Sequence, residues 1–506
     1  MNPGSAALRQ PVEPLAPAGY DTAFFGHPRG LSTLFFTEMW ERFSYYGMRA
    51  LLILFMTAAP AAGGLGFDAA TAGAIYGLYT SMVYLTTLPG GWIADRLIGG
   101  QRAVLYGGIL ISAGHFSMAV PSLSTFYLGL FLIVVGTGLL KGNVSVIVGR
   151  LYSADDARRD AGYSIFYMGI NTGAFVAPLV CGYLGQRVDW HLGFAAAGVG
   201  MVLGLVQYVF GLKYLGEASK HPATRGASDE SVQRRIAVRW TTAVVVLLAI
   251  FGIGAFTGML PVTATQVADA AGYFLLGLVV AFLGWLFFSG GWTREERKRL
   301  YAIAVLFVAA ALFWSQFEQA GSTFNLFAER AVEKSIAGYE FPASWLQSMN
   351  AIFIIMLAPV FAWIWLTLGR THKEPSNAVK FGLGLVFVGS GFGVLIAAAI
   401  LAEGGVMVSP MWLVLTYLLH TCGELSLSPV GMSAMTKLAP VRIGGLIMGF
   451  WFLALSAGNY IGGRIAGLYE AWTLPGLFSA VAAFGIGAGL VMFLVARPVT
   501  RLEHAQ

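Results

Sequence analysis

The sequence contains little charge and almost no cysteine. Only 11% of its 506 residues are charged, whereas 57% are hydrophobic; a soluble domain usually carries about 25% charged residues. This imbalance excludes soluble globular, disordered and collagen-like proteins, and it predicts a polytopic membrane protein. The two cysteines, Cys181 and Cys422, lie in apolar runs, so neither a disulfide framework nor a cysteine-rich metal site is indicated.

Histidine is also scarce, and its spacing indicates no chemistry. The seven histidines show no metal-ligand pattern such as HExxH, and we expect no metal site, no cofactor other than the proton and no catalytic residues. A membrane enzyme would need a nucleophile with a base or a metal cluster, and a channel would need pore-lining rings or repeated filter segments. Neither pattern is evident, which leaves a transporter as the favoured class.

The small net charge is basic. Lys and Arg outnumber Asp and Glu by 31 to 25, a formal charge of +6. In a membrane protein such an excess is typical of cytoplasmic loops, so it indicates a lipid bilayer and no nucleic-acid partner. Residues 1–30 hold five prolines and lack the apolar core of a signal peptide. We therefore expect a retained N-terminal tail.

Runs of about 20 mainly apolar residues, the length that spans a bilayer, recur along the chain. The fourteen predicted spans cover residues 31–58, 69–95, 102–121, 125–149, 160–185, 191–213, 239–260, 267–290, 301–328, 343–368, 378–402, 409–436, 443–468 and 474–496. Lys and Arg gather in alternate loops, which is the pattern expected when these loops and both termini are cytoplasmic. The predicted fold class is an all-α membrane protein.

Polar linkers divide these spans into groups of six, two and six. We assign a cytoplasmic tail to 1–30, a six-helix bundle to 31–213, linkers and an extra helix pair to 214–300, a second six-helix bundle to 301–496 and a cytoplasmic tail to 497–506. Two such halves with substrate held between them are typical of the major facilitator fold. The segment GWIADRLIGGQR at 91–102 resembles the signature loop of that superfamily.

Four charged residues lie inside the first predicted span. A charge at the bilayer centre costs about 2.5 to 3.5 kcal/mol, so an ionisable residue there indicates a functional site. At 100° per residue, five side chains fall within an arc of roughly 100°. They are Glu38, Glu41, Arg42, Tyr45 and Arg49. We predict one polar stripe that faces the interior of the bundle.

Later spans hold further ionisable groups. Lys141, in GTGLLKGN, needs a carboxylate partner or must lose its proton. Glu318 and Glu424 are buried carboxylates of the second bundle, and His420, which shares a face with Glu424, is read as a core histidine. Other polar or aromatic candidates inside the spans are Tyr84, Asn171, Trp314, Asn350, Ser428 and Trp451.

The acids inside the spans outnumber the bases. Glu38, Glu41, Glu318 and Glu424 stand against Arg42, Arg49 and Lys141, which leaves one carboxylate available to carry a proton. Arg464 would cancel this surplus if it faced the cavity. A cavity with carboxylates in one place and cations in another suits a zwitterionic substrate. If protonation of a carboxylate shifts the equilibrium between conformations, transport becomes coupled to protons. The residues alone therefore predict a proton-coupled symporter of a peptide or amino acid.

Three segments resemble the proton-dependent oligopeptide transporters, the POT family of the major facilitator superfamily. Residues 38–47, EMWERFSYYG, are similar to the family's ExxERFxYY motif, and residues 166–173 and 423–429 are also family-like. The resemblance implies import of di- and tripeptides with protons by alternating access in a bacterial inner membrane. It also implies the extra helix pair of bacterial members.

The resemblance implies a role for each candidate residue. Arg42 and Lys141 would bind the peptide carboxylate, and Glu424 would bind the amino end with Asn171 and Asn350. The pocket walls would be Tyr45, Tyr46, Tyr84, Trp314 and Trp451, with Ser428 beside Glu424 in the substrate site. The proton-coupling set would be Glu38, Glu41 and Glu318, with Glu41 exchanging partners with Lys141 and Glu318 with Arg49.

One alternative within the transporters is a relative that moves nitrate, a single amino acid or another small solute. The intact motif at 38–47, together with Glu424 as a partner for an amine, favours peptides. The expected partners are thus a di- or tripeptide, protons and the bilayer, and a monomer is the expected assembly.

Overall fold

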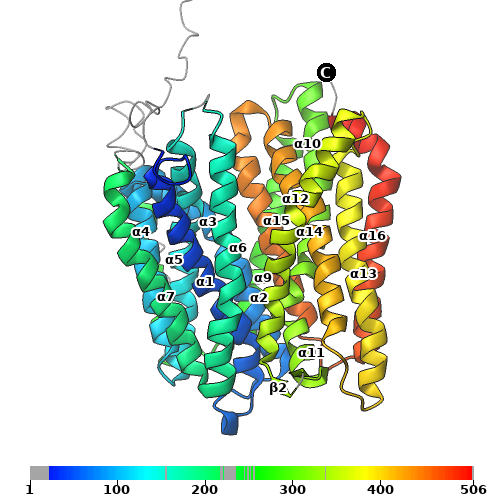
Figure 1. The fold of residues 1–506 in the computed structure, drawn as a ribbon. Coiled ribbons are helices and arrows are strands. Elements are labelled where there is room, and N and C mark those ends of the chain that lie inside the picture. Colours follow the sequence, from blue (N-terminus) through cyan, green and yellow to red (C-terminus); the bar gives the residue numbers. More distant parts are fainter. Residues whose placement is uncertain are drawn as a thin grey trace, which may run out of the picture.

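The computed structural model describes residues 22–153, 156–216, 257–336 and 338–503, together with residue 220 and short helical pieces between 235 and 254. Apart from one short hairpin, the described chain is built from helices that stand side by side (Figure 1). We call the end of the bundle where the C-terminus lies the upper end, and the end marked by α11 and β2 the lower end (Figure 1).

The first half of the described chain follows the predicted spans. Its helices are α1 (Arg29–Thr57), α2 (Ala69–Leu85), α3 (Thr87–Ile93), α4 (Gly100–Met118), α5 (Leu123–Arg150), α6 (Arg159–Tyr183) and α7 (Trp190–Gly211), with short turns η1 (Pro60–Ala62), η2 (Ala94–Ile98), η3 (Leu184–Val188) and η4 (Leu212–Tyr214). Asp68 caps α2 by accepting a hydrogen bond from the Thr71 N–H at 2.7 Å. α1 packs against α6 and α7, and α4 packs against α5 and α7.

The second half is longer and contains the hairpin. Its elements are α9 (Ala264–Phe288), α10 (Arg294–Phe317), η5 (Glu318–Gly321), α11 (Thr323–Ala331), β1 (Ser335–Ile336), β2 (Tyr339–Glu340), η6 (Ala343–Gln347), α12 (Ser348–Arg370), α13 (Asn377–Glu403), α14 (Met411–Leu438), η7 (Val441–Ile443), α15 (Gly444–Ala466) and α16 (Leu474–Glu503). β1 and β2 pair antiparallel, with Ser335 opposite Glu340. α13 packs against α14 and α16, and α10 packs against α15 and α16.

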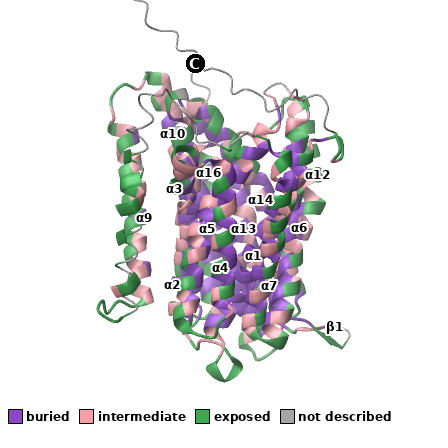
Figure 2. Cartoon of the chain, turned by 90° about the vertical axis from the view of Figure 1, so that its left-hand side faces the viewer, coloured by how far each residue is buried: buried purple, intermediate pink, exposed green. Residues whose placement is uncertain are grey.

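The outer surface of the bundle is apolar. Phe288 is 90% exposed, Leu494 81% and Tyr273 76%, and Figure 2 shows exposed positions on the outside of the bundle and buried ones inside it. Within the described residues, nine helices are long and apolar enough to cross a membrane. The chain is therefore an integral, multi-pass membrane protein with an almost entirely helical fold.

The predicted count of fourteen spans is not confirmed as a number. α1 carries five charges along its length and α2 ends after 17 residues, so neither is among those nine. The span predicted at 239–260 lies partly outside the described residues. The division into tails, bundles and linkers stays a prediction.

The span predicted at 301–328 is wrong as a single helix. α10 ends at Phe317, the chain makes the short turn η5, and α11 begins at Thr323. Ser322, between η5 and α11, has φ −126° and ψ −86°, which is not helical. The break begins at Glu318, a predicted proton-coupling residue. The apolar pattern continues on both sides of it, so nothing in the sequence marks the end of the helix.

The two halves touch along α2 and α15. The backbones approach so closely that a Cβ added at Gly73 would lie 2.6 Å from the carbonyl oxygen of Gly463. Small residues permit this kind of contact between membrane helices. Nearby, the Ser456 hydroxyl donates to the carbonyl of Ser81 at 2.8 Å. Along this line the halves therefore meet largely through main-chain atoms.

α9 stands at the edge of the bundle (Figure 2) and packs against α2, α10 and α15. Arg464 on α15 pairs with Asp269 on α9, with Nη1 and Oδ1 3.0 Å apart, and both side chains are nearly half exposed. Arg464 therefore does not cancel a carboxylate of the central cavity, contrary to the alternative considered from the sequence. Its partner, Asp269, belongs to the extra helix pair. A count of the acids and bases in the two six-helix halves leaves this residue out.

Candidate functional site

The polar stripe of α1 is buried, as predicted, and its upper part forms one cluster of charges. Glu38, Glu41 and Arg42 are at most 3% exposed. The Nε of Arg42 lies 3.1 Å from Oε1 of Glu38, and it also donates to Glu41. One guanidinium thus holds two carboxylates. Two carboxylate oxygens, Glu38 Oε2 and Glu41 Oε1, have no hydrogen-bond partner in the described part of the chain.

Lys141 approaches this cluster from α5. Its Nζ lies 3.7 Å from the centre of the Tyr84 ring on α2, a cation–π contact. Within the described residues no carboxylate lies within ion-pair distance of Lys141, although Arg42 and Glu41 are its main charged neighbours. Lys141 as a residue is half-buried. Lys141 therefore lies inside the bundle without an ion-pair partner among the described residues.

Arg49 leaves the cluster and reaches the other half of the protein. Its Nη2 lies 2.7 Å from Oε2 of Glu318 and donates to the Glu318 carbonyl at 3.2 Å, while its Nε donates to the Tyr76 hydroxyl at 2.8 Å. Arg49 and Glu318 are each 4% exposed. This buried ion pair joins α1 to the break between α10 and α11.

A second carboxylate site lies on the other half. Asn350 on α12 donates through Nδ2 to Oε2 of Glu424 at 3.1 Å and to the Thr421 hydroxyl at 3.0 Å. Asn350 and Glu424 are both partly exposed, and no cation pairs with Glu424 in the described residues. The predicted association of Asn350 with Glu424 is thus present in the geometry. An amide donor fixes one carboxylate oxygen and leaves the other available to a cationic ligand.

The predicted aromatic residues differ in what they contact. Tyr45 and Tyr46 meet edge to face, with ring centres 5.2 Å apart, and the guanidinium groups of Arg42 and Arg49 lie over these two rings at 5.2 and 5.8 Å. Trp451 is 2% exposed, and its ring packs where a Cβ at Gly431 would otherwise stand. Trp451 is therefore mainly a packing residue in this conformation, whereas the tyrosines lie beside the cations.

The remaining candidates make local contacts. Trp314 is 6% exposed and packs edge to face on Phe313 and Phe317. Asn171 donates through Nδ2 to the carbonyl of Tyr167, one turn earlier in the same helix, at 3.0 Å. Ser428 is partly exposed one turn beyond Glu424 on α14. These positions do not join the two charged clusters directly.

His420 is a core histidine, as the sequence analysis favoured. It is 1% exposed and lies among the rings of Phe317, Phe324 and Phe392, with ring centres 5.2 to 6.1 Å away. It packs so closely on Gly391 that a Cβ there would lie 2.7 Å from its Nε2. The ring fills space between α10, α11, α13 and α14 and does not face either charged cluster.

Comparison with known proteins identifies the family. The family model described as "POT family" matches residues 101–484. The chain belongs to the POT family. A POT relative named as a peptide transporter of Yersinia enterocolitica is 43% identical over 493 residues, covering 95% of this chain and 96% of that protein. A di-/tripeptide transporter of Lactococcus lactis is 39% identical over 493 residues, covering 95% and 98%.

The POT fold is shared with solved structures. A variant of a peptide transporter crystallised with alafosfalin is 42% identical and superposes with a TM-score of 0.86, covering 95% of this chain and 96% of that one. This similarity extends over both halves, so the chain has the major facilitator fold that its six-and-six pattern predicted.

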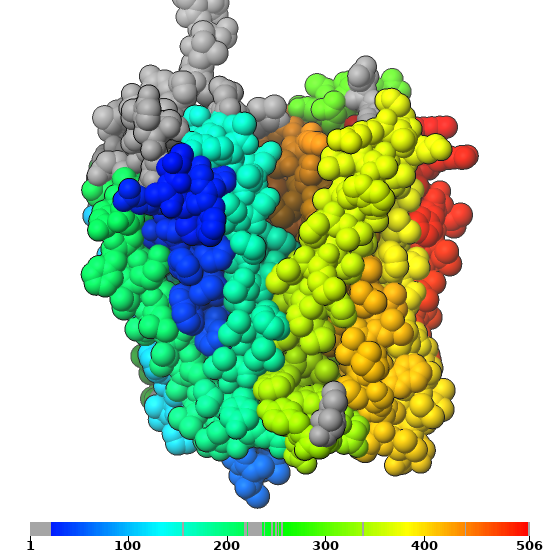
Figure 3. All heavy atoms as spheres, in the orientation of Figure 1, coloured from blue at the N-terminus to red at the C-terminus, as the bar shows by residue number. Residues whose placement is uncertain are grey.

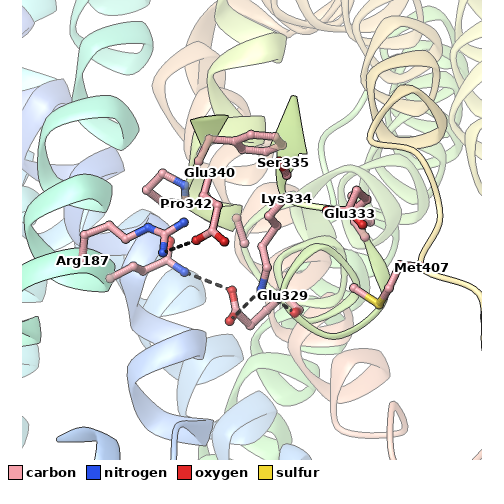
Figure 4. A pocket seen from close by; sticks show the side chains of 12 residues that line it. Arg187, Glu329, Glu333, Lys334, Ser335, Glu340, Pro342 and Met407 are labelled. Atoms are coloured by element: carbon pink, nitrogen blue, oxygen red, sulfur yellow. Dashed lines mark hydrogen bonds and ion pairs between the residues drawn. The ribbon is translucent and has the colours of Figure 1, made fainter. Parts of the chain in front are cut away.

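The lower end of this POT protein is closed by a second set of contacts that the sequence did not reveal. Gln186 in η3 donates to Glu329 at 3.1 Å and accepts from the Ser344 N–H at 3.1 Å, and Arg187 pairs with Glu340 at 3.1 Å (Figure 4). Gln186, Arg187, Glu329 and Glu340 line a cavity of about 330 Å³ between the two halves. The partners are 143 to 158 residues apart in the sequence, so no local pattern marks them as a pair.

Two further hydrogen bonds extend this closure between α6 and the start of α12. The indole N–H of Trp345 donates to the Leu179 carbonyl at 3.0 Å, and the Ser348 hydroxyl donates to the Phe175 carbonyl at 2.8 Å. Backbone acceptors in a membrane helix carry no sequence signal. At the upper end, by contrast, the space-filling view shows a recess between α6 and α12 with orange C-terminal helices at its base (Figure 3).

Proposed function

We propose that this POT protein is a symporter that imports di- and tripeptides together with protons by alternating access. It lies in the bacterial cytoplasmic membrane with both termini in the cytoplasm, acts as a monomer, catalyses no reaction and needs no cofactor besides the proton. Membership of the POT family supports the transport of peptides, and the names of the relatives in Yersinia and Lactococcus support this substrate class.

One observation carries the proposal: opposite charges suited to the two ends of a peptide are held on different halves. Arg42 and Lys141 lie on α1 and α5, while Glu424 is held by Asn350 between α14 and α12. A peptide carboxylate pairs with the first set and the amino group with the second. A bound peptide therefore connects the halves, and its binding energy favours conformations in which they are correctly spaced.

Side chains around these charges accept varied peptide side chains. Aromatic rings provide large apolar surface with few rotatable bonds. The proposed walls are Tyr45, Tyr46, Tyr84, Trp314 and Trp451, and Asn171 and Ser428 add hydrogen-bonding groups. Since the peptide backbone termini are fixed by charge, the walls need only exclude water and make few specific contacts.

Protons act on the carboxylates that pair with bases. With Glu318 ionised, Arg49 ties α1 to the break after α10, and the lower end stays closed. Protonation of Glu318 removes the charge attraction and frees the halves to separate there. Glu38 and Glu41 share Arg42 in this conformation, and Glu41 moves to Lys141 when the peptide carboxylate leaves. These exchanges couple proton and peptide movement.

The conformation described here fits one stage of this cycle. The lower end is closed by Arg49 and Glu318 and by the contacts of Gln186, while the upper end is recessed between α6 and α12 (Figure 3). With the termini in the cytoplasm, the upper end is the cytoplasmic one. The protein is then inward-facing, ready to release or rebind peptide from the cytoplasm.

Uptake of labelled dialanine into proteoliposomes tests the proposal. An inward proton gradient should drive accumulation, and an uncoupler should abolish it. Nitrate and free alanine, tested as competitors, should not reduce dialanine uptake at equal concentration. No dialanine uptake by verified folded protein, or accumulation that the uncoupler leaves unchanged, would contradict the proposal.

A further inference from the structure

A pocket at the upper end lies outside the transport path. It occupies about 320 Å³ between the start of α13 and the last turns of α16, and it is lined by Ser376, Val379, Ala496, Arg497, Thr500 and Arg501. The lining is mainly apolar, and the residues that form it include two arginines and two hydroxyl side chains. α16 lies at the outer edge of the bundle (Figure 1), and none of the residues assigned to the central site lines this pocket.

The two arginines lie at the depth of lipid headgroups. About 20 helical residues cross the hydrocarbon core at 1.5 Å per residue, and α16 begins at Leu474, so the core ends near Leu494. Arg497 lies about 4.5 Å further along the helix axis and Arg501 one turn beyond it. Both guanidinium groups therefore sit just outside the hydrocarbon core.

An apolar surface leads directly to these arginines. Residues 490, 494, 497 and 501 are spaced by four, three and four, so their side chains share one face of α16. Leu490 is 53% exposed and Leu494 81% exposed, and Arg497 and Arg501 are also exposed. An acyl chain that follows the two leucines places its headgroup between the two arginines.

Within the described residues the two arginines have no protein partner, unlike Arg442 and Lys380 near the same end. Arg442 contacts the Gly291 carbonyl and Glu296 and stacks on Trp292, and Lys380 pairs with Glu374 at 2.5 Å. No hydrogen bond or ion pair within the described residues involves the side chain of Arg497 or Arg501. The nearby Glu503 bonds instead to Asn377, at 3.2 Å, and does not line the pocket.

We infer that this pocket binds the headgroup of an anionic phospholipid. Guanidinium groups recognise phosphate oxygens in pairs of parallel hydrogen bonds, and basic pockets between membrane helices at the headgroup level suit such lipids. Exposed basic residues at a membrane boundary are common; the pocket and the leucine stripe below it distinguish this pair. The site is independent of the proposed peptide transport and of the orientation of the protein.

The test compares lipid binding by full-length protein and two variants of equal charge change. Wild type, Arg497→Gln with Arg501→Gln, and the control Arg294→Gln with Arg297→Gln are placed in nanodiscs of phosphatidylcholine with a minor fraction of phosphatidylglycerol. Arg294 and Arg297 are exposed at the start of α10 and do not line the pocket. Native mass spectrometry then counts each lipid retained by the protein, and thermal unfolding in detergent checks that all three are folded.

Wild type and control should retain phosphatidylglycerol preferentially, and the pocket variant should lose this preference by about thirtyfold, or about fivefold per arginine. Equal loss in control and pocket variant, or no loss in either, would overturn the site. Displacement of the lipid by millimolar inorganic phosphate would show a free-anion site and overturn the lipid assignment. Because transport is not measured, failure of the peptide proposal would leave this result unaffected.

Discussion

Arg49 on α1 contacts Glu318 twice, through the carboxylate at 2.7 Å and through the backbone carbonyl at 3.2 Å. The carbonyl belongs to η5, where α10 ends. One guanidinium thus binds both the side chain of Glu318 and the backbone at the point where α10 ends. Neutralising the carboxylate leaves a weaker contact to a segment that is not held by regular helical hydrogen bonds.

Glu318→Gln should uncouple transport from the proton gradient. The amide cannot exchange a proton, so gradient-driven dialanine uptake should fall at least about tenfold, in the range of typical coupling energies. Counterflow exchange of labelled for unlabelled dialanine needs no net proton movement and should persist. Uptake by the variant that still follows the gradient would refute the role of Glu318.

Tyr76→Phe should weaken the closed lower end without removing any charge. It deletes the hydroxyl that accepts from Arg49 at 2.8 Å, a hydrogen bond to a charged group, with a contribution of about 1.5 to 3 kcal/mol. Tyr79→Phe is the matched control, because Tyr79 is on the same helix, is 3% exposed and its hydroxyl has no partner in the described residues. Thermal unfolding and uptake should change in the first variant only.

Glu424→Gln should weaken binding of peptides with a free amino end. The variant keeps a group that can accept from Asn350 but loses the charge that attracts an ammonium, so dialanine affinity should fall by about 2 kcal/mol or more, which is about thirtyfold. N-acetylated dialanine, which lacks that ammonium, should bind wild type and variant alike. Competition binding measures both, and equal dialanine affinities would remove Glu424 from the site.

A disulfide between α6 and η6 should lock the lower end. A Cβ added at Gly182 would lie 3.2 Å from the Cβ of Ser344, close to the 3.5 to 4.5 Å typical of disulfides. Gly182→Cys with Ser344→Cys should abolish uptake under oxidation and recover it under reduction. Each single variant is a control, because it shows whether the new cysteine forms a disulfide with the native Cys181. Continued uptake by a fully cross-linked protein would contradict closure at this point.

The stability of the fold should depend on Glu470 at acidic pH. The Ala69 N–H, which donates to its carboxylate at 3.0 Å, and then Arg330, hold the pKa of Glu470 below its ordinary 4.5. The ionised group therefore stabilises the fold above pH 4.5, and this contribution is lost as the pH falls through the lowered pKa.

Thermal unfolding of wild type and Glu470→Gln across pH checks this dependence. Wild type should be the more stable at pH 7, and the difference should shrink as the pH falls below 4.5. Glu333→Gln, at an exposed carboxylate of the same end, is the control. A difference independent of pH would show that Glu470 acts by packing alone.

The sequence predicted the helices and the charged stripe of α1 because both follow from local periodicity. Spans such as 125–149 and 378–402 match α5 and α13 within two residues at each end. The partners were harder to predict. Glu38 and Glu41 share Arg42, one turn or less away in the same helix, whereas the partners of Arg464 and Gln186 come from segments distant in the sequence.

Two features had no local signal at all. The break at η5 lies inside an apolar run that reads as one span, since Glu318 looks the same in a straight helix as at a helix end. The hydrogen bonds of Trp345 and Ser348 go to backbone carbonyls, which every residue offers. Predicting either feature requires the packing of the two halves against each other.

The close contact of Gly73 with Gly463 has a consequence for the rate of the transport cycle. Helices joined by interlocking side chains must withdraw ridges from grooves before their crossing angle changes. Gly73 and Gly463 present no side chains to each other, so at this point no ridge has to leave a groove when α2 and α15 rotate. The activation barrier between conformations then arises mainly from the polar contacts at either end, and protons and peptides can alter these contacts. The apolar interface between the halves, which protons and peptides do not alter, contributes little to the barrier.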